Sequence, residues 1–424
     1  MYFNISQVKP ISISLSPNTE KDDVFFAFKL LFQPWKWKKG NAIERLEKEF
    51  ENYLGLKSAI SFNSGRSSLM AILNCLGFEK GSEIILQAFT CNAASNPIIW
   101  NDLIPIYADC NDDFNIDIND LKKKITLRQA QGKHPKAVIV QHTFGNPADM
   151  DEIIQICKTN NLILIEDCAH SLGATYKNKK IGTIGEVSFF SFSRDKVISS
   201  VYGGMVATNN NVLAQKIRDY QQKIGYPSLF WIRQQLLHPV LMNWKILPTY
   251  KICGKYLLIL SQWFHILSKA VHWKEKRGLC PGYFPKAMPN ALAILALNQF
   301  KKLERFNNHR KEIANFYRQE LEGTDFELPE VKQDRKPNYL RFSIKHPNAL
   351  KIIRKAWHNN MLIGDWYTTP IAPHDTKIEK IYYALGSCPN AERLAKITLN
   401  LPTHINISEK EAKIIVDFVK ANAN

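Results

Sequence analysis

Acidic and basic side chains that could share one pocket follow two apolar runs of the sequence. Residues 162–165 form a short aliphatic run, the pattern of a strand buried on both faces, and Asp167 and His170 come just after it. A second run, 187–192, ends shortly before Lys196. Ligands of open α/β sheets bind at the carboxyl ends of the strands. A carboxylate after one strand and a lysine after another can therefore face one pocket.

An acid and a lysine in one pocket meet the two main requirements of pyridoxal phosphate chemistry. The acid keeps the ring nitrogen of the cofactor protonated, and the lysine forms an imine with it. Asp167 and Lys196 are the candidates for these roles, and Lys196 would also move the substrate proton. Each residue has a structural alternative, because Asp167 could cap a helix and Lys196 could be a solvated loop lysine.

Several linked motifs in this region resemble the DegT/DnrJ/EryC1/StrS family of nucleotide-sugar aminotransferases, which have fold type I. The motifs are EDCAHSLGA at 166–174, GTIG at 182–185, FSF at 190–192 followed by Lys196, and Gly203-Gly204. The likeness extends from about residue 10 to the C-terminus, apart from a long insertion near 226–282. Related dehydratases carry histidine at the position of Lys196, so the resemblance favours transamination.

The resemblance implies a pyridoxal 5′-phosphate enzyme that transfers an amino group to a keto sugar attached to a nucleotide. Glutamate is the expected amino donor, and surface polysaccharide or a related glycan is the expected destination. A homodimer with shared active sites is also implied. The alternative is a family member that no longer turns over and acts as a regulator or scaffold.

A turn between a predicted strand and a predicted helix is the expected binding site for the cofactor phosphate. Gly65, Arg66 and Ser67 open this helix, where free backbone N–H groups and the helix dipole favour an anion. Arg66 departs from the small residue usual in the family, and it either binds the phosphate or points into solvent. Ser191 matches the phosphate-binding serine of the family.

Other positions are weaker candidates. His170 is expected beside the cofactor ring or as a structural histidine, and Phe89 is expected to stack on the ring because Cys91 occupies the usual aromatic position. Lys286 could replace a basic group that reaches the neighbouring subunit in the family. The candidate substrate contacts are Trp366, Tyr367 and His374, for which a packed loop is the alternative. No metal site is expected.

Strand and helix patterns alternate through the first half of the chain, which predicts an α/β fold with a mostly parallel, doubly wound sheet of seven strands. These strands are expected at 59–62, 83–87, 104–108, 137–142, 162–166, 187–192 and 204–208. Residues 122–136 are interpreted as a surface loop, and helices are expected at 290–322, 347–358 and 408–421. The expected units are an N-terminal arm (1–40), a large cofactor-binding domain (41–225), the insertion (226–282), a linking helical region (283–325) and a smaller C-terminal α+β domain (326–424).

Composition limits the partners and the compartment. The 424 residues include 56 Lys and Arg against 39 Asp and Glu, a net charge of +17 that favours anionic substrates or membrane surfaces. No nucleic-acid-binding motif is evident, so nucleic acid is not an expected partner. The eight cysteines form no CxxC pair and are interpreted as free thiols. The N-terminus has no signal-peptide pattern, and a cytoplasmic enzyme is expected.

The insertion has an unusual charge distribution. From Tyr220 to Lys274 the sequence holds no Asp or Glu, and its Lys and Arg residues supply only positive charge. Residues 256–273 are expected to form an amphipathic helix with a broad apolar face and a narrow polar stripe. Such a helix suits the headgroup region of an anionic membrane, so a peripheral contact through 226–275 is one hypothesis. The alternative is packing on a dimer partner or over the active site.

Overall fold

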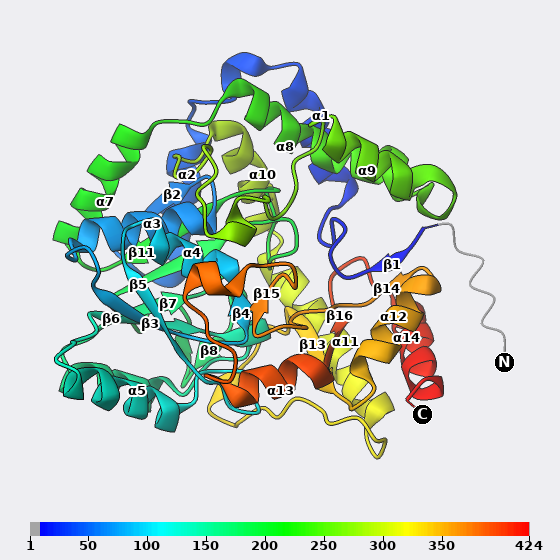
Figure 1. Ribbon diagram of the computed structural model, residues 1–424. Helices are drawn as coiled ribbons and strands as arrows, with labels where there is room; N and C mark the ends of the chain where they lie inside the picture. Colours follow the sequence, from blue (N-terminus) through cyan, green and yellow to red (C-terminus); the bar gives the residue numbers. More distant parts are fainter. Residues whose placement is uncertain (1–8, 424) are drawn as a thin grey trace.

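A seven-stranded sheet forms the centre of the computed structural model, which describes residues 9–423 (Figure 1). The strand order is β2-β11-β10-β7-β6-β3-β5, and β11 is antiparallel to both neighbours while the other pairs are parallel. The strands are β2 (Ser58–Phe62), β3 (Glu83–Gln87), β5 (Ile104–Ala108), β6 (Ala137–Gln141), β7 (Ile163–Asp167), β10 (Val187–Ser191) and β11 (Gly204–Thr208). The prediction of a mostly parallel seven-stranded sheet is confirmed.

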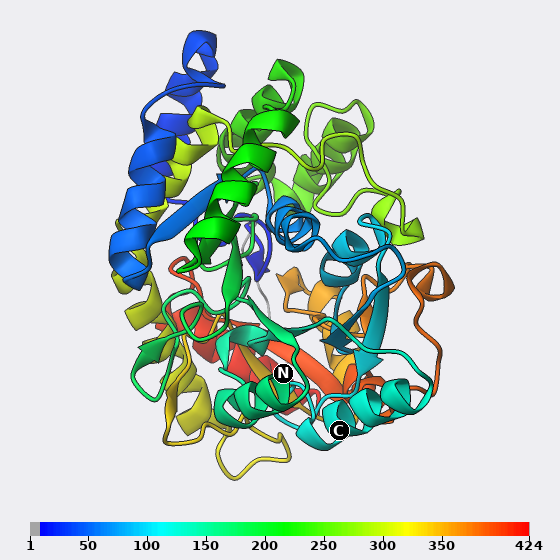
Figure 2. The ribbon, with the colours of Figure 1, turned by 90° about the vertical axis from the view of Figure 1, so that its left-hand side faces the viewer.

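Helices cover both faces of this sheet, as Figures 1 and 2 show. One apolar core lies between the sheet and a set of helices that comprises α1 (Lys21–Leu31), α2 (Ala42–Leu54), α5 (Ile118–Ala130), α6 (Met150–Thr159), α8 (Leu229–Leu241) and α10 (Asn290–Phe300). The other core contains side chains of α3 (Gly65–Leu76), α4 (Asn92–Ile99), α7 (Asn211–Ile224) and α13 (Pro389–Ile397). The sheet is therefore buried on both faces, which explains its nearly continuous apolar strands.

Two local predictions are wrong. The predicted loop at 122–136 is helical as far as Ala130, because Leu121 and Ile125 lie one turn apart on the buried face of α5 while its other face is polar and basic. The predicted helix 290–322 consists of two helices, α10 and α11 (Leu303–Leu321). The chain breaks between them at Lys302, whose Nζ binds Asp22 at the start of α1.

The C-terminal part of the chain has its own small core. Strands β13 (Arg341–Lys345) and β16 (Thr398–Pro402) pair antiparallel, and α11, α12 (Ala349–His358) and α14 (Glu409–Ala421) pack beside them. Short pairings connect this lobe to other parts of the chain. The N-terminal β1 (Ile11–Ser12) pairs with β14 (Met361–Leu362), and β4 (Thr90–Cys91) pairs with β15 (Ile371–Ala372).

A further small sheet joins β8 (Thr175–Tyr176) to β9 (Lys179–Lys180) and β12 (Arg335–Lys336). The N-terminal helix α1 is followed by a 3₁₀ turn at Pro34–Lys36. Of the expected N-terminal arm, residues 1–8 lie outside the described residues. The eight cysteines are free thiols, as expected, and five of them are buried.

The insertion is less regular than predicted. After α8, π-helical turns at Met242–Ile246 and Tyr250–Gly254 lead into α9 (Lys255–Trp263). The predicted helix 256–273 is wrong beyond Trp263, because the chain turns at His265, which has a φ of 55°. Within residues 9–423, no helix is both long and apolar enough to cross a bilayer.

Candidate active site

A cavity of about 390 Å³ lies at the carboxyl ends of the central strands. Nine of the predicted site residues line it: Gly65, Arg66, Asp167, His170, Ser191, Lys196, Trp366, Tyr367 and His374. They come from α3, from the loops after β7 and β10, and from the segment before and after β15. The topology therefore assembles residues that lie more than 300 positions apart in the sequence.

Asp167 is the last residue of β7, and it is buried at the base of the cavity. Its Oδ1 accepts a hydrogen bond from the Ala169 N–H at 3.0 Å. Burial raises the pKa of Asp167, and the Ala169 N–H and the charge of Lys196 offset only part of this effect. None of the ion pairs among the described residues includes Asp167, so its carboxylate is available to a cationic group in the cavity.

Lys196 lies in the loop after β10, and its Nζ sits 4.4 Å from the centre of the Trp366 ring. Burial lowers the pKa of Lys196, although the charge of Asp195 opposes the shift. A lower pKa increases the fraction of neutral amine, the form that attacks a carbonyl carbon. The loop itself is fixed from behind, because Asn18 Nδ2 donates to the Lys196 carbonyl at 2.5 Å.

His170 is held as a neutral ring beneath Trp366. Its Nδ1 accepts a hydrogen bond from the Phe144 N–H at 3.3 Å, and its ring stacks on Trp366 with centres 5.3 Å apart. Burial and the nearby charges of Lys196 and Arg341 hold the pKa of His170 well below its usual value. His170 can therefore offer an Nε2–H donor at neutral pH, but not a positive charge.

The first turn of α3 faces the loop that follows β10. A Cβ on Gly65 would lie 3.0 Å from Ser191 Cβ, and a Cβ on Gly204 would lie 2.6 Å from the Gly65 nitrogen. Glycine at both positions lets the helix N-terminus, the Ser191 hydroxyl and β11 approach closely. Backbone N–H groups and a hydroxyl at a helix start fit a phosphate.

Arg66 does not point into solvent, and its guanidinium is bound within the protein. Its Nε forms an ion pair with Glu275 Oε2 at 2.5 Å, and both side chains are buried. The Arg66 guanidinium also donates to the Ala270 carbonyl at 3.4 Å. Although Arg66 lines the cavity, its main partner is therefore a carboxylate in the segment that follows the insertion helices.

Two other predicted cofactor contacts are not in the cavity wall. Phe89 is fully buried behind it, where its ring stacks on Phe114 at 5.2 Å and packs edge-on against Tyr367. The Ser67 hydroxyl donates to Asn63 Oδ1 at 2.6 Å, and the Ser67 N–H donates to the N-cap Ser64. Both residues support the site from outside.

The insertion supplies part of the cavity wall, as in the alternative in which it packs over the active site. Leu258 and Gln262 of α9 and Ala270 and Val271 of the following segment line the cavity. Arg194 also lines it, and its guanidinium donates to the Ser268 carbonyl at 2.8 Å. Lys286, the proposed reach toward a neighbouring subunit, instead donates to the Ile224 carbonyl of its own chain at 2.8 Å.

The sequence also does not predict which residue supports the loop that carries Lys196. Arg310 of α11 is fully buried, and it donates to the Val197 carbonyl and to Asn18 Oδ1, both at 2.8 Å. Burial lowers the pKa of Arg310 to about 9. No local pattern could have found this contact, because Asn18 and Arg310 are 292 positions apart.

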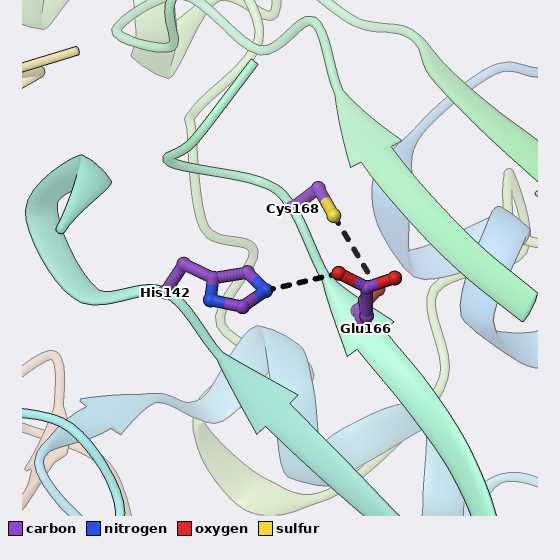
Figure 3. Close-up of side chains that lie close together, drawn as sticks. All are labelled: His142, Glu166 and Cys168. Carbon is purple, nitrogen blue, oxygen red and sulfur yellow. Dashed lines mark hydrogen bonds and ion pairs between the residues drawn. The ribbon is translucent and has the colours of Figure 1, made fainter. Parts of the chain in front are cut away.

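A buried cluster beside Asp167 resembles a metal site, but its carboxylate and imidazole make hydrogen bonds within the protein. Figure 3 shows His142, Glu166 and Cys168 close together. Glu166 accepts hydrogen bonds from three backbone N–H groups, at 182, 184 and 185, and His142 Nε2 lies 3.3 Å from it. Because His142 Nδ1 accepts from the Ala148 N–H, His142 is neutral and donates through Nε2. The cluster therefore anchors the end of β7.

The cavity thus fits pyridoxal 5′-phosphate. It combines a buried carboxylate without a cation, a lysine of lowered pKa, an aromatic wall and a helix start that suits a phosphate.

Comparisons with known proteins find similar chains among sugar aminotransferases. GDP-perosamine synthase from Caulobacter vibrioides is 26% identical over 97% of this chain and 98% of its own length. UDP-N-acetyl-3-dehydro-alpha-D-glucosamine 3-aminotransferase from Acidithiobacillus ferrooxidans is 26% identical over 90% of this chain and 88% of its own. Helicobacter pylori PseC, an aminotransferase involved in the biosynthesis of pseudoaminic acid, superimposes with a TM-score of 0.74 at 21% identity and covers 98% of this chain and 99% of its own.

The sequence profile of the DegT/DnrJ/EryC1/StrS aminotransferases matches residues 20–235 and 261–420 and leaves 236–260 unmatched. Proteins of this family use pyridoxal 5′-phosphate as their cofactor. The chain belongs to the DegT/DnrJ/EryC1/StrS aminotransferase family.

Proposed function

We propose that this aminotransferase moves an amino group from glutamate onto a keto sugar carried by a nucleotide, for the synthesis of a surface polysaccharide or a related glycan. The observation that carries the proposal is the placement of Asp167 and Lys196 in one cavity. The names of the relatives support the substrate class, since one of them acts on a UDP-linked dehydro sugar.

When bound, pyridoxal phosphate accepts the electrons released at the reacting carbon. In our proposal, the Asp167 carboxylate holds the proton on the ring nitrogen. The Lys196 amine would hold the cofactor covalently, and as a free amine it would carry a proton to and from the reacting carbon. The lowered pKa of Lys196 suits both tasks, because the amine must be neutral to attack and to accept a proton.

The remaining residues would position the cofactor and the substrate. The N–H groups at the start of α3, around Gly65, and the Ser191 hydroxyl would hold the phosphate. His170 and Trp366 form a stacked pair in the cavity and would enclose the cofactor ring. Tyr367 and His374 also line the cavity and, together with Trp366, remain the proposed substrate contacts.

We also propose a homodimer and a peripheral contact with an anionic membrane through residues 226–275. The dimer follows from the family resemblance. Light scattering at the working concentration should give twice the mass of the 48.7 kDa chain, and an active monomer would contradict the dimer.

A panel of keto sugar nucleotides tests the function. Protein loaded with pyridoxal phosphate should lose its visible absorbance with glutamate and regain it with the matching keto sugar nucleotide. Mass spectrometry should then find an amino sugar nucleotide. A protein that binds the cofactor but reacts with no amino donor would contradict the proposal and support a regulator or scaffold.

A further inference from the structure

Exposed apolar side chains gather on two neighbouring parts of the chain. In α1 and the turn after it, Phe25, Phe28, Phe32 and Trp35 are exposed. Between residues 229 and 273 of the insertion region, the exposed ones are Leu229, Phe230, Trp244, Ile252, Tyr256, Leu257, Ile259, Leu260, Trp263, Phe264, Ile266 and Trp273. Together these form most of the large apolar side chains exposed by residues 9–423. We call the two groups together the α1–α9 face.

The two groups are in contact. Helix α1 packs along α8, and the Phe28 ring lies 5.0 Å from the Trp244 ring. Figure 1 shows α1, α8 and α9 along the upper side of the molecule. Large exposed apolar patches on soluble proteins mark sites of interaction with proteins or membranes.

The charge on the α1–α9 face has one sign. From position 226 to position 274 the insertion has no acidic residue and carries six basic ones: Arg233, Lys245, Lys251, Lys255, Lys269 and Lys274. At the other part of the face, Lys36, Lys38 and Lys39 follow α1. The two acids of α1, Asp22 and Asp23, are occupied by Lys302.

This positive charge distinguishes between two possible partners of the α1–α9 face, a second copy of the chain and a lipid bilayer. A second copy of the chain in a two-fold symmetric contact would place the same basic surface against itself, which is repulsive. An anionic bilayer supplies the opposite charge for the lysines, and its headgroup region accommodates tryptophan and phenylalanine. No described helix can cross the bilayer, so the contact would be peripheral.

We infer that the α1–α9 face docks on the surface of an anionic lipid bilayer. The docking face is therefore larger than the insertion, because α1 contributes to it. It also depends on residues 236–260, which the family profile does not match.

Docking would bring the bilayer next to the active site. Helix α9 exposes Ile259 and Trp263 outward, while its Leu258 and Gln262 line the cavity. Docking would hold the enzyme where a membrane process consumes its product. This role of docking rests on the proposed function. Binding to lipid does not depend on that function.

Vesicle flotation with the cofactor-loaded protein tests the inference. The vesicles are phosphatidylcholine alone or phosphatidylcholine with 30% phosphatidylglycerol, a fraction on the order of that in anionic membranes. The protein should float with the anionic vesicles and not with the neutral ones. Binding should fall at least about tenfold between 0.05 and 0.5 M salt, because screening weakens the attraction of lysines to lipid.

Paired substitutions test both parts of the face. W263D/F264D on the insertion and F32D/W35D beside α1 should each reduce anionic-vesicle binding at least about tenfold. All four side chains are more than 60% exposed, so their replacement leaves the core intact. V212D/L385D is the matched control, since both side chains are as exposed but lie outside the face, and it should float like the parent protein.

Each other outcome overturns the inference. A parent protein that does not float with anionic vesicles, or floats equally with neutral ones, would exclude anionic docking. If F32D/W35D floats like the parent, α1 is not part of the face. If W263D/F264D instead turns a dimer into a monomer in light scattering, the face binds a second copy. Turnover of a soluble sugar nucleotide is measured in parallel, so a failure of the proposed function is distinguished from a failure to bind lipid.

Discussion

The side chains in the cavity have different proposed roles toward the cofactor. Asp167 and Lys196 are proposed to meet the cofactor directly, whereas His170 and Trp366 enclose it. Burial is the largest cause of the pKa shifts of Asp167, Lys196 and His170: it raises the pKa of the acid and lowers the pKa of the two bases.

Lys196→Ala should abolish covalent cofactor binding, because the cavity lining contains no other lysine. The expected result is loss of the visible absorbance and a fall in turnover of at least about 1,000-fold, since the variant lacks the group that moves the proton. Absorbance spectra before and after addition of glutamate measure both. A variant that retains its visible band would show that another amine forms the bond.

Asp167→Asn should separate binding from activity. The asparagine keeps the shape of the side chain but cannot hold a proton on the ring nitrogen as a carboxylate does, so turnover should fall about 100-fold. Cofactor affinity, measured by titration with pyridoxal phosphate, should change far less because the phosphate contacts remain. Near-normal turnover would contradict the proposed role of Asp167.

At the scale of elements, α11 supports the lysine loop from behind. The Arg310 guanidinium bridges the Val197 carbonyl and Asn18, and it also donates to Asn307 at 3.0 Å. Asn307 in turn donates to the Leu172 carbonyl, which lies in the loop after β7. One helix therefore fixes the loops that carry both Asp167 and Lys196.

Arg310→Lys should weaken this support. The compact lysine ammonium lacks the planar fork by which two guanidinium nitrogens reach these three acceptors. One or more buried acceptors would be left unpaired, at a cost of about 2 to 3 kcal/mol in the free energy of unfolding. Urea denaturation measures the loss of stability. If the loop of Lys196 shifts in this variant, kcat should fall more than KM for the amino donor changes. Arg305→Lys is the matched control on the same helix, since Arg305 is exposed and should have little effect.

The sequence predicted the elements better than it predicted their contacts. All seven strands of the main sheet follow from short apolar runs bounded by turns, and the linked motifs placed Asp167 and Lys196 in order. The Arg66–Glu275 pair and the position of Phe89 depend on contacts between distant parts of the chain, which no local pattern encodes. The end of α9 at Trp263 was missed because the apolar spacing continues beyond it, although the backbone turns at His265.

At the scale of the whole molecule, an ion-pair cluster joins the large sheet region to the C-terminal part. Asp149, the N-cap residue of α6, pairs with Arg335 at 2.5 Å and with Lys332 at 2.8 Å. Burial alone would raise the pKa of Asp149, but the hydrogen bonds and charges of its two partners more than offset this, so its pKa lies below the usual value.

This shift predicts a pH dependence of stability. A carboxyl group whose pKa is lower in the folded state stabilises the fold above its unfolded pKa, and this contribution is lost as the pH falls through the folded pKa. The parent should therefore lose stability below about pH 4 more steeply than Asp149→Asn. Thermal unfolding of both proteins from pH 3 to pH 7 checks this, and parallel curves would show that Asp149 contributes nothing.

The pairing of β1 with β14 has a consequence for how the chain folds during synthesis. Residues 11–12 leave the ribosome long before their partners at 361–362 and before His404, whose Nε2 lies 2.9 Å from the Ser12 carbonyl. Asn18, which holds the Lys196 carbonyl, belongs to the same N-terminal segment. The large sheet can form before those partners are made, whereas the N-terminal segment that supports the loop of Lys196 is held in place only after residues 361–404 have been synthesised.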